Sequence, residues 1–239
     1  MNNTIQELFD RKSVRSFADR EISGEDVRLI LEAAVMAPTA GNQQLYTIIN
    51  VTDQEKKDRL AESCDHQPFI AKARLVLVFC ADMLKWYRAY QMADAGPRKP
   101  DAGDFVLAVE DAVIAAQNAV VAAHSLGIGS CYIGDIMENY EIQREILDLP
   151  EYVFPAAMLV FGYPTEQQIR RKKPARVPME YIVRENTYRK MDDEEIRGMF
   201  REKSCGDFDD FMKKFCRRKY NSDFAREMSR SIRAFLDTL

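Results

Sequence analysis

Two nearly continuous apolar segments narrow the folds that are open to this chain more than any other feature. They are LVLVFCA at residues 75–81 and AAMLVFGYP at residues 156–164. A strand that is apolar at almost every position needs cover on both faces, because a strand with one wet face alternates apolar and polar residues. A third strand is indicated at residues 45–51, LYTIINV, which is β-branched and bounded by polar residues. The sequence therefore predicts a sheet that lies between two layers of helices.

Helices suited to cover this sheet occur between and around the strands. Ser23 and Asp26 resemble a capping box at the start of a helix whose apolar residues follow on one face. Shorter helices are indicated after Asp53 and at residues 138–147. The most apolar helix is expected at residues 106–127, and because it is apolar on most of its circumference it should be the central buried helix. This alternation places the chain in the α+β or three-layer α/β class.

Glycine and proline mark two connections in the chain. Residues 94–104, DAGPRKPDAGD, are expected to be a loop, and GIGSCYIG at residues 127–134 a glycine-spaced loop. Beyond residue 165 the chain is charged and helix-prone, with few apolar residues for a core of its own. We therefore expect one domain over residues 1–239, in which residues 165–239 form a helical excursion that packs on the main body or on a second subunit.

Composition excludes several classes of protein. The net charge of −4 argues against general nucleic-acid binding, because nucleic-acid-binding domains are usually basic. No apolar run approaches the roughly 20 residues that span a bilayer, and the first residues lack the apolar core of a signal peptide. The cysteines form no CxxC pair, and the histidines complete no recognisable metal site with them. We expect a cytoplasmic protein without metal, nucleic-acid or membrane partners, in which Cys80 and Cys131 are packing residues.

Motifs for self-contained catalysis are missing from the sequence. No GxGxxG follows a strand, and there is no Walker A loop or GxSxG elbow. Two histidines without a partnering motif give little support to a Ser-His-Asp hydrolase. If the chain is an enzyme, a bound cofactor must bring the chemistry, so we expect no catalytic side chain.

The segment RKSVRSF at residues 11–17 is a candidate anion site. In an extended segment Arg11, Ser13 and Arg15 would project to one side, and guanidinium groups suit phosphate because they offer a fixed fork of donors. A second basic segment, RRKKPAR at residues 170–176, could close on the same phosphate, or it could be a solvated charge run. PTAGNQQ at residues 38–44 could hydrogen-bond a polar ring edge, or it could be a plain turn.

Taken together, these segments resemble the nitroreductase family of FMN-dependent oxidoreductases. The resemblance is to the NADPH-dependent branch with the oxygen-insensitive nitroreductases and bacterial flavin reductases. Matching motifs occur in order along the chain: RKSVRSF, APTAGNQQ, HQPFIAKA, GIGSCYIGDI, LVFGYP, KPARVP, VRENTY and NSDFAREMSRSI. The resemblance implies an α+β, three-layer fold with a mixed central sheet, assembled as a homodimer with the flavin at the interface.

The resemblance also implies which residues contact FMN. Arg11 and Ser13 match positions that hold the phosphate and the ribityl chain, and Arg15 matches the cation near flavin N1 and O2. KPAR carries one residue more than the family's Lys-Pro-Arg, so Lys172 and Lys173 both remain candidates for the lysine. The expected contacts are Arg11, Lys12, Ser13, Arg15, Thr39, Asn42, Gln67, Tyr132, Ile133, Gly134, Lys173 and Arg176.

The implied reaction is a ping-pong, two-electron reduction of a small molecule such as a nitroaromatic, a quinone or a flavin. The electron donor would be NADPH or NADH, and Arg217 or Arg218 could bind the 2′-phosphate of NADPH, unless they form a solvated helix face. Trp86, Tyr87 or Tyr90 could line the acceptor pocket. Two alternatives remain open: another reaction of the same fold, such as flavin reduction or dehalogenation, and an anion- or phosphate-binding module without redox activity.

Overall fold

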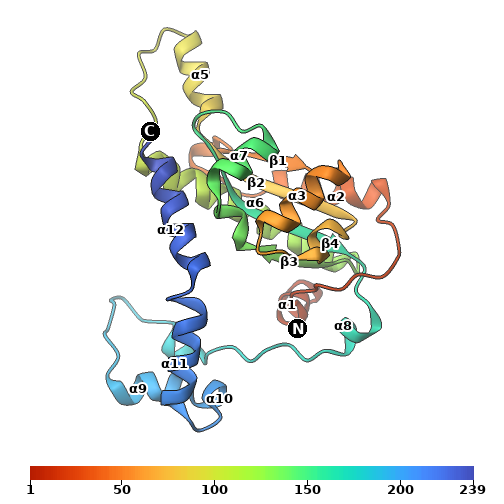
Figure 1. Ribbon diagram of the computed structural model, residues 1–239, viewed down its shortest axis with the longest axis vertical. Helices are drawn as coiled ribbons and strands as arrows, with labels where there is room; N and C mark the ends of the chain where they lie inside the picture. Colours follow the sequence, from red (N-terminus) through yellow and green to blue (C-terminus); the bar gives the residue numbers. More distant parts are fainter. The chain divides into compact units, whose positions relative to one another are not determined.

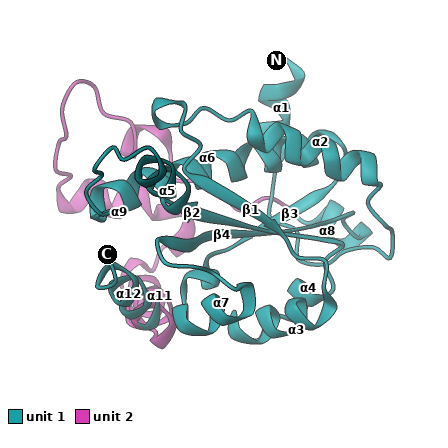
Figure 2. Ribbon diagram, turned by 90° about the horizontal axis from the view of Figure 1, so that it is seen from above, with its two compact units in different colours: residues 1–171, 227–239 teal, residues 172–226 magenta.

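The structure is a computed structural model that describes all 239 residues. The chain forms two compact units, which Figure 2 shows in different colours. Unit 1 comprises residues 1–171 and 227–239, and unit 2 comprises residues 172–226.

Unit 1 is built around one four-stranded sheet in the order β1-β2-β4-β3. The strands are β1 (Tyr46–Asn50), β2 (Leu75–Asp82), β3 (Gly129–Ile133) and β4 (Val153–Gly162). Strands β2 and β4 are buried at every position, as their continuous apolar sequences predict. The α+β class is confirmed. The sheet is less mixed than expected, because its four strands pair antiparallel and the one parallel pairing is an isolated bridge between Ser13 and Ser130.

Helices cover both faces of the sheet, as Figures 1 and 2 show. One face carries α2 (Gly24–Val35) and α6 (Ala102–Ser125), and the other carries α3 (Gln54–Ser63), α4 (Pro68–Ala71) and α7 (Tyr140–Leu147). Each face has its own apolar core. The three-layer arrangement predicted from the strands is therefore present. The other helices of this unit are α1 (Asn3–Asp10), α5 (Leu84–Met92), α8 (Glu166–Arg170) and most of α12 (Asp223–Leu236).

Helix α6 differs from its prediction in extent and in burial. It begins at Ala102 because Asp101 and Asp104 form a capping box, so the loop before it is shorter than residues 94–104. Its alanine-rich face packs on the sheet, but Val106, Val113 and Ile114 on another face are 40–54% exposed. By length and composition α6 could cross a bilayer, yet its buried alanine face marks it as a core helix with a second, uncovered apolar face.

The glycine-spaced segment 127–134 is not the loop that its sequence predicts. Residues 129–133 form β3, an edge strand that pairs with β4, and a 3-10 turn (Gly134–Met137) follows it. A five-residue strand beside several glycines has too short an apolar pattern to be recognised. Its order comes from the hydrogen bonds to β4.

Unit 2 is helical and has almost no interior. It contains α9 (Asp193–Met199), α10 (Arg201–Ser204), α11 (Phe208–Lys219) and a 3-10 turn (Met179–Tyr181), and none of these elements has a buried residue. A chain of phenylalanine rings, among them Phe200 and Phe211, joins α10 and α11. The predicted excursion over residues 165–239 has other bounds than this unit, because residues 227–239 belong to unit 1 and Phe235 is buried in its core.

Candidate cofactor site

The RKSVRSF segment runs in an extended conformation along the outer edge of β3. The backbone N–H of Val14 donates to the carbonyl of Ser130 at 2.9 Å, and Ser13 bridges Ser130 in parallel. Further along, Phe17 bridges Pro164 just beyond the end of β4. The segment therefore continues the sheet past its edge strand, which also satisfies backbone groups that an edge strand leaves unpaired.

Two glycines allow the segment to lie so close to the sheet. A Cβ at Gly129 would lie 2.7 Å from a methyl carbon of Val14, and a Cβ at Gly162 would lie 2.7 Å from the ring of Phe17. These separations are too short for any side chain larger than hydrogen. Val14 is 4% exposed and fills the space beside Gly129. Because neighbouring side chains of an extended segment point to opposite sides, the packing of Val14 also fixes the direction of Ser13 and Arg15.

Three of the predicted cofactor residues gather against β3. The Arg11 guanidinium lies 5.8 Å from the centre of the Tyr132 ring. Burial raises the pKa of the Cys131 thiol, while the neighbouring Arg15, Ser13 and Arg11 side chains lower it. Cys131 itself is 1% exposed, so it is the packing residue that the sequence predicts. Two guanidiniums and a hydroxyl thus surround one short stretch of β3.

A residue of α6 also holds Tyr132. Its hydroxyl donates to Oε1 of Gln117 at 3.3 Å. Burial raises the pKa of Tyr132 to about 12, and Arg11 opposes this shift. The ring therefore stays a neutral phenol that Arg11 can contact through its face.

The first residues of the 170–176 basic segment reach the RKSVRSF segment. Lys12 Nζ donates to the carbonyl of Ile169 at 2.7 Å and to the carbonyl of Arg171. In return, the Arg171 guanidinium donates to the carbonyl of Ser13. Within unit 1, these reciprocal bonds bring Arg171 and Lys12 beside Ser13. Lys12 thus joins the RKSVRSF segment to residues 169–171 through two hydrogen bonds, and it adds a positive charge beside Ser13.

Gln67 and Gly134 come together at the end of β3. Gln67, the N-cap residue of α4, donates from Nε2 to the carbonyl of Cys64 at 2.8 Å and to Oδ2 of Asp135 at 3.1 Å. Asp135 directly follows Gly134 in the 3-10 turn. Ile133 is 2% exposed, so its side chain lies in the core and only its backbone can face a ligand.

Thr39 and Asn42 lie near the opposite edge of the sheet. Their loop leads into β1, whereas β3 is the other edge strand. Buried Asp111 of α6 anchors the loop by accepting from the backbone N–H groups of Ala40 at 2.9 Å and Leu45 at 3.1 Å. Thr39 Oγ1 accepts from a backbone N–H inside the same loop, and Asn42 is exposed with a positive φ of 58°. Within one chain, these two residues are not grouped with the β3 cluster.

The match to known proteins decides the family. The model of the nitroreductase family matches residues 8–163, which is more than half of the chain. This chain belongs to the nitroreductase family. The family resemblance carried by its motifs is therefore confirmed.

Several family members resemble the chain over most of its length. An FMN reductase [NAD(P)H] from Bacillus subtilis is 33% identical, covering 100% of this chain and 93% of the relative. An oxygen-insensitive NADPH nitroreductase from Salmonella typhimurium is 34% identical over 81% of this chain and 78% of its own. The solved structure of an NADPH:FMN oxidoreductase from Vibrio harveyi, complexed with NAD+, has a TM-score of 0.82 at 25% identity and covers 98% of each chain.

Four residues that were not among the expected cofactor contacts also build this site. They are Arg171, which contacts Ser13, Gln117, which accepts from the Tyr132 hydroxyl, and the glycines at 129 and 162 beneath the extended segment. Arg171 lies in the basic run at 170–176 and the glycines lie in the motifs GIGSCYIGDI and LVFGYP, whereas no pattern in the sequence signals Gln117. Lys172, Lys173 and Arg176 of the same run belong to unit 2, and their contact with the cofactor stays a prediction.

Proposed function

We propose that this nitroreductase-family chain is an FMN-dependent NAD(P)H oxidoreductase that reduces nitroaromatics, quinones or flavins by two electrons. The observation that carries the proposal is the gathering of Arg11, Ser13 and Arg15 against β3, next to Tyr132. Names of relatives support the same activity, since they include FMN reductases and an NADPH nitroreductase.

The donor set of this site fits FMN. A phosphate dianion needs cations and hydrogen-bond donors, which Arg11 and Ser13 offer on one short segment and Arg171 offers beside it. A flavin ring needs a neutral face and polar contacts at its edge, which the Tyr132 strand and the Gln67 amide can offer. Neither a nucleophile nor a metal cluster is part of this set, and no group of three or more metal-ligating side chains occurs among the 239 described residues.

The chain's own residues bind, orient and stabilise charge. When bound, FMN would supply the two-electron redox chemistry between NAD(P)H and the acceptor. Arg11, assisted by Lys12 and Arg171, would hold the phosphate end. Arg15 would place a fixed positive charge where the ring becomes more negative, and a charge already in position needs little reorganisation.

A homodimer would complete the site. Helices α1 and α6 leave large apolar side chains exposed, including Leu8, Phe9 and Ile114, which is more than isolated surface residues usually explain. Thr39 and Asn42 are anchored near the sheet edge opposite to β3. A second copy that covers the apolar surface could therefore bring its own Thr39 loop to the β3 cluster. The same arrangement would put the cofactor at the subunit interface.

Unit 2 is proposed to contribute the remaining cationic contacts. Lys173 and Arg176 would complete the cofactor site, and Lys172 is the alternative to Lys173. On α11, the guanidinium of Arg218 lies over the face of the Phe215 ring, 5.2 Å from the ring centre. Arg217 or Arg218 would then favour NADPH over NADH through its 2′-phosphate. A cytoplasmic location is supported by five free cysteines.

The test is the colour of the purified protein and its response to NADPH without oxygen. We expect a yellow protein that contains one FMN per chain and bleaches when NADPH is added. A colourless protein that binds phosphate but neither takes up added FMN nor oxidises NADPH would contradict the proposal. That result would favour the non-redox anion-binding alternative.

A further inference from the structure

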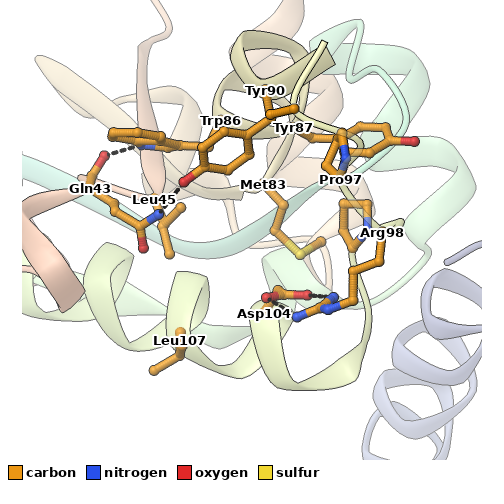
Figure 3. A pocket seen from close by; sticks show the side chains of 12 residues that line it. Gln43, Leu45, Met83, Trp86, Tyr87, Tyr90, Pro97, Arg98, Asp104 and Leu107 are labelled. Carbon is orange, nitrogen blue, oxygen red and sulfur yellow. Dashed lines mark hydrogen bonds and ion pairs between the residues drawn. The ribbon is translucent and has the colours of Figure 1, made fainter. Parts of the chain in front are cut away.

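Two cavities of unit 1 differ in how their charges are arranged. The aromatic cavity, of about 430 Å³, lies between α5 and the start of α6, and its wall includes Trp86, Tyr87 and Tyr90, the residues expected from the sequence to line the acceptor pocket. Its one cation, Arg98, contacts Asp104 at 2.5 and 3.0 Å, as Figure 3 shows. The second cavity, in contrast, contains a buried cation without an ion-pair partner.

This second cavity, here called the lysine cavity, has a volume of about 510 Å³. Its size falls within the range of roughly 300–1,000 Å³ that is typical of small-molecule sites. Its lining comes from the stretch between Phe17 and Glu21, from α3 and from residues 71–74. None of the residues expected to contact FMN is part of this lining, although Phe17 is the last residue of RKSVRSF. The lysine cavity is therefore separate from the candidate cofactor site.

Lys57 of α3 is the buried cation of this cavity. The residue is 8% exposed, and its Nζ donates one long hydrogen bond of 3.4 Å, to the carbonyl of Ala73. No carboxylate forms an ion pair with it. Burial lowers the pKa of Lys57, an effect that Glu21 opposes and Arg74 reinforces. Because an ammonium group has three N–H donors and is rarely buried without a partner, Lys57 has donors to offer to a ligand.

The other charges of the lining determine which ligand charge fits. Arg74 forms ion pairs with both Asp19 and Glu21, so these three side chains already satisfy one another. Lys72 is exposed and makes no ion pair, and it adds a second positive charge to that of Lys57. Three cations and two carboxylates leave the lining with a net charge of +1. One negative charge would neutralise this lining, whereas the two carboxylates would repel a phosphate dianion.

We propose that the lysine cavity binds a small organic monocarboxylate, whose carboxylate group pairs with the ammonium group of Lys57. Lys72 would add a weaker contact from the solvent side. Phe17, Ala18 and Ala71 belong to the same lining and offer apolar contact to the rest of the ligand. The inference does not depend on the proposed function, because no residue of this lining was assigned to FMN, to NAD(P)H or to the acceptor.

Benzoate is the probe, and isothermal titration calorimetry with the FMN-loaded protein measures its binding. We expect one benzoate per chain and an unchanged flavin absorption spectrum. Lys57→Met should weaken binding at least tenfold, because methionine keeps an unbranched side chain but lacks the charge. The matched control is Lys56→Met, which removes the same charge from the neighbouring residue of α3, outside the lining, and should bind benzoate like the parent.

Three results of this titration would overturn the inference. They are the absence of saturable benzoate binding, equal benzoate affinities of Lys57→Met and the parent, and binding seen only as a flavin absorption change that persists in Lys57→Met. Inorganic phosphate should bind at least tenfold more weakly than benzoate. Tighter binding of phosphate than of benzoate, lost in Lys57→Met, would refute the carboxylate as the ligand class.

Urea unfolding separates a ligand site from a purely structural lysine. Without benzoate, Lys57→Met should unfold at the same urea concentration as the parent or at a higher one, because the variant no longer buries an unpaired charge. A lower midpoint would contradict this reasoning and assign Lys57 to holding the Ala73 carbonyl. Benzoate should raise the midpoint of the parent and of Lys56→Met, but not that of Lys57→Met. A rise in all three proteins would overturn the inference.

Discussion

Glu138 should make the stability of this protein fall as the pH rises from about 4.5 to about 7. Its side chain is 4% exposed, and Oε1 is buried without a hydrogen-bond partner. Burial, reinforced by the negative charges of Asp135, Asp65 and Glu227, raises the pKa of Glu138 from 4.5 to about 7. In the folded protein this carboxyl therefore keeps its proton at a pH where the unfolded chain has already lost it.

The sign and size of the effect follow from this difference. Well below pH 4.5 both states are protonated and ionisation of Glu138 does not change the free energy of unfolding, whereas above pH 7 the folded protein must hold a buried charge. A pKa moved from 4.5 to about 7 corresponds to a loss of up to about 3 kcal/mol. The loss develops between those two pH values. Glu227, whose pKa is lowered to about 2 chiefly by its hydrogen bond to Arg230, acts in the opposite direction only under more acidic conditions.

Glu138→Gln isolates this contribution because it keeps the shape and removes the charge. Urea unfolding, followed by circular dichroism at pH 5 to 8 with fixed protein and FMN concentrations, should show the variant gaining on the parent as the pH rises. At pH 8 the variant should be more stable by up to about 3 kcal/mol. Glu62→Gln, at an exposed position on α3, is the matched control. A parent–variant difference that is constant from pH 5 to pH 8 would refute the reasoning.

Three further changes test the architecture of the site. Gly129→Ala should displace Val14 and weaken FMN binding at least tenfold, as measured by equilibrium dialysis. Gly103→Ala should bind FMN like the parent protein, because a Cβ at Gly103 meets nothing within 4 Å. Equal FMN affinities of the Gly129→Ala variant and the parent would contradict the close-packing argument. Asp111→Ala should lower the free energy of unfolding by about 2–4 kcal/mol, because two backbone N–H groups lose their acceptor. Chemical denaturation measures this change, and a loss below about 0.5 kcal/mol would show that Asp111 does not anchor the loop before β1. If the proposed homodimer forms through α6, Ile114→Glu should be monomeric in sedimentation equilibrium and should retain less FMN. A variant that remains a stable dimer would exclude α6 from the interface.

The layers of the fold could be predicted because local patterns determine them. Strands β2 and β4 are apolar throughout, and Ser23 caps α2 by accepting from the backbone N–H of Asp26 at 3.0 Å. Strand β3 was not predictable, since its five residues gain their order from pairing with β4. The exposure of the second apolar face of α6 was also not predictable. The sequence of an apolar helix is the same whether this face packs in the core or against another subunit.

The sequence predicts which residue types form the candidate site, but not the long-range contacts that hold these residues in place. The alternation of Arg11, Ser13 and Arg15 indicates an anion site through residue type and spacing alone. The close approach of Gly129 to Val14 joins residues more than a hundred positions apart, and nothing local signals it. The same holds for the bond from Arg171 to the carbonyl of Ser13. Such long-range contacts depend on how the layers pack.

The most direct test of the central claim is the rate at which NADPH reduces the FMN of Arg15→Ala, measured by anaerobic stopped-flow. If the RKSVRSF segment holds the cofactor and Arg15 stabilises charge on its ring, the variant should bind FMN more weakly and be reduced at least tenfold more slowly. Arg28→Ala, on the exposed face of α2, should behave like the parent. An Arg15→Ala protein that binds FMN with parent affinity and is reduced at the parent rate would contradict the account.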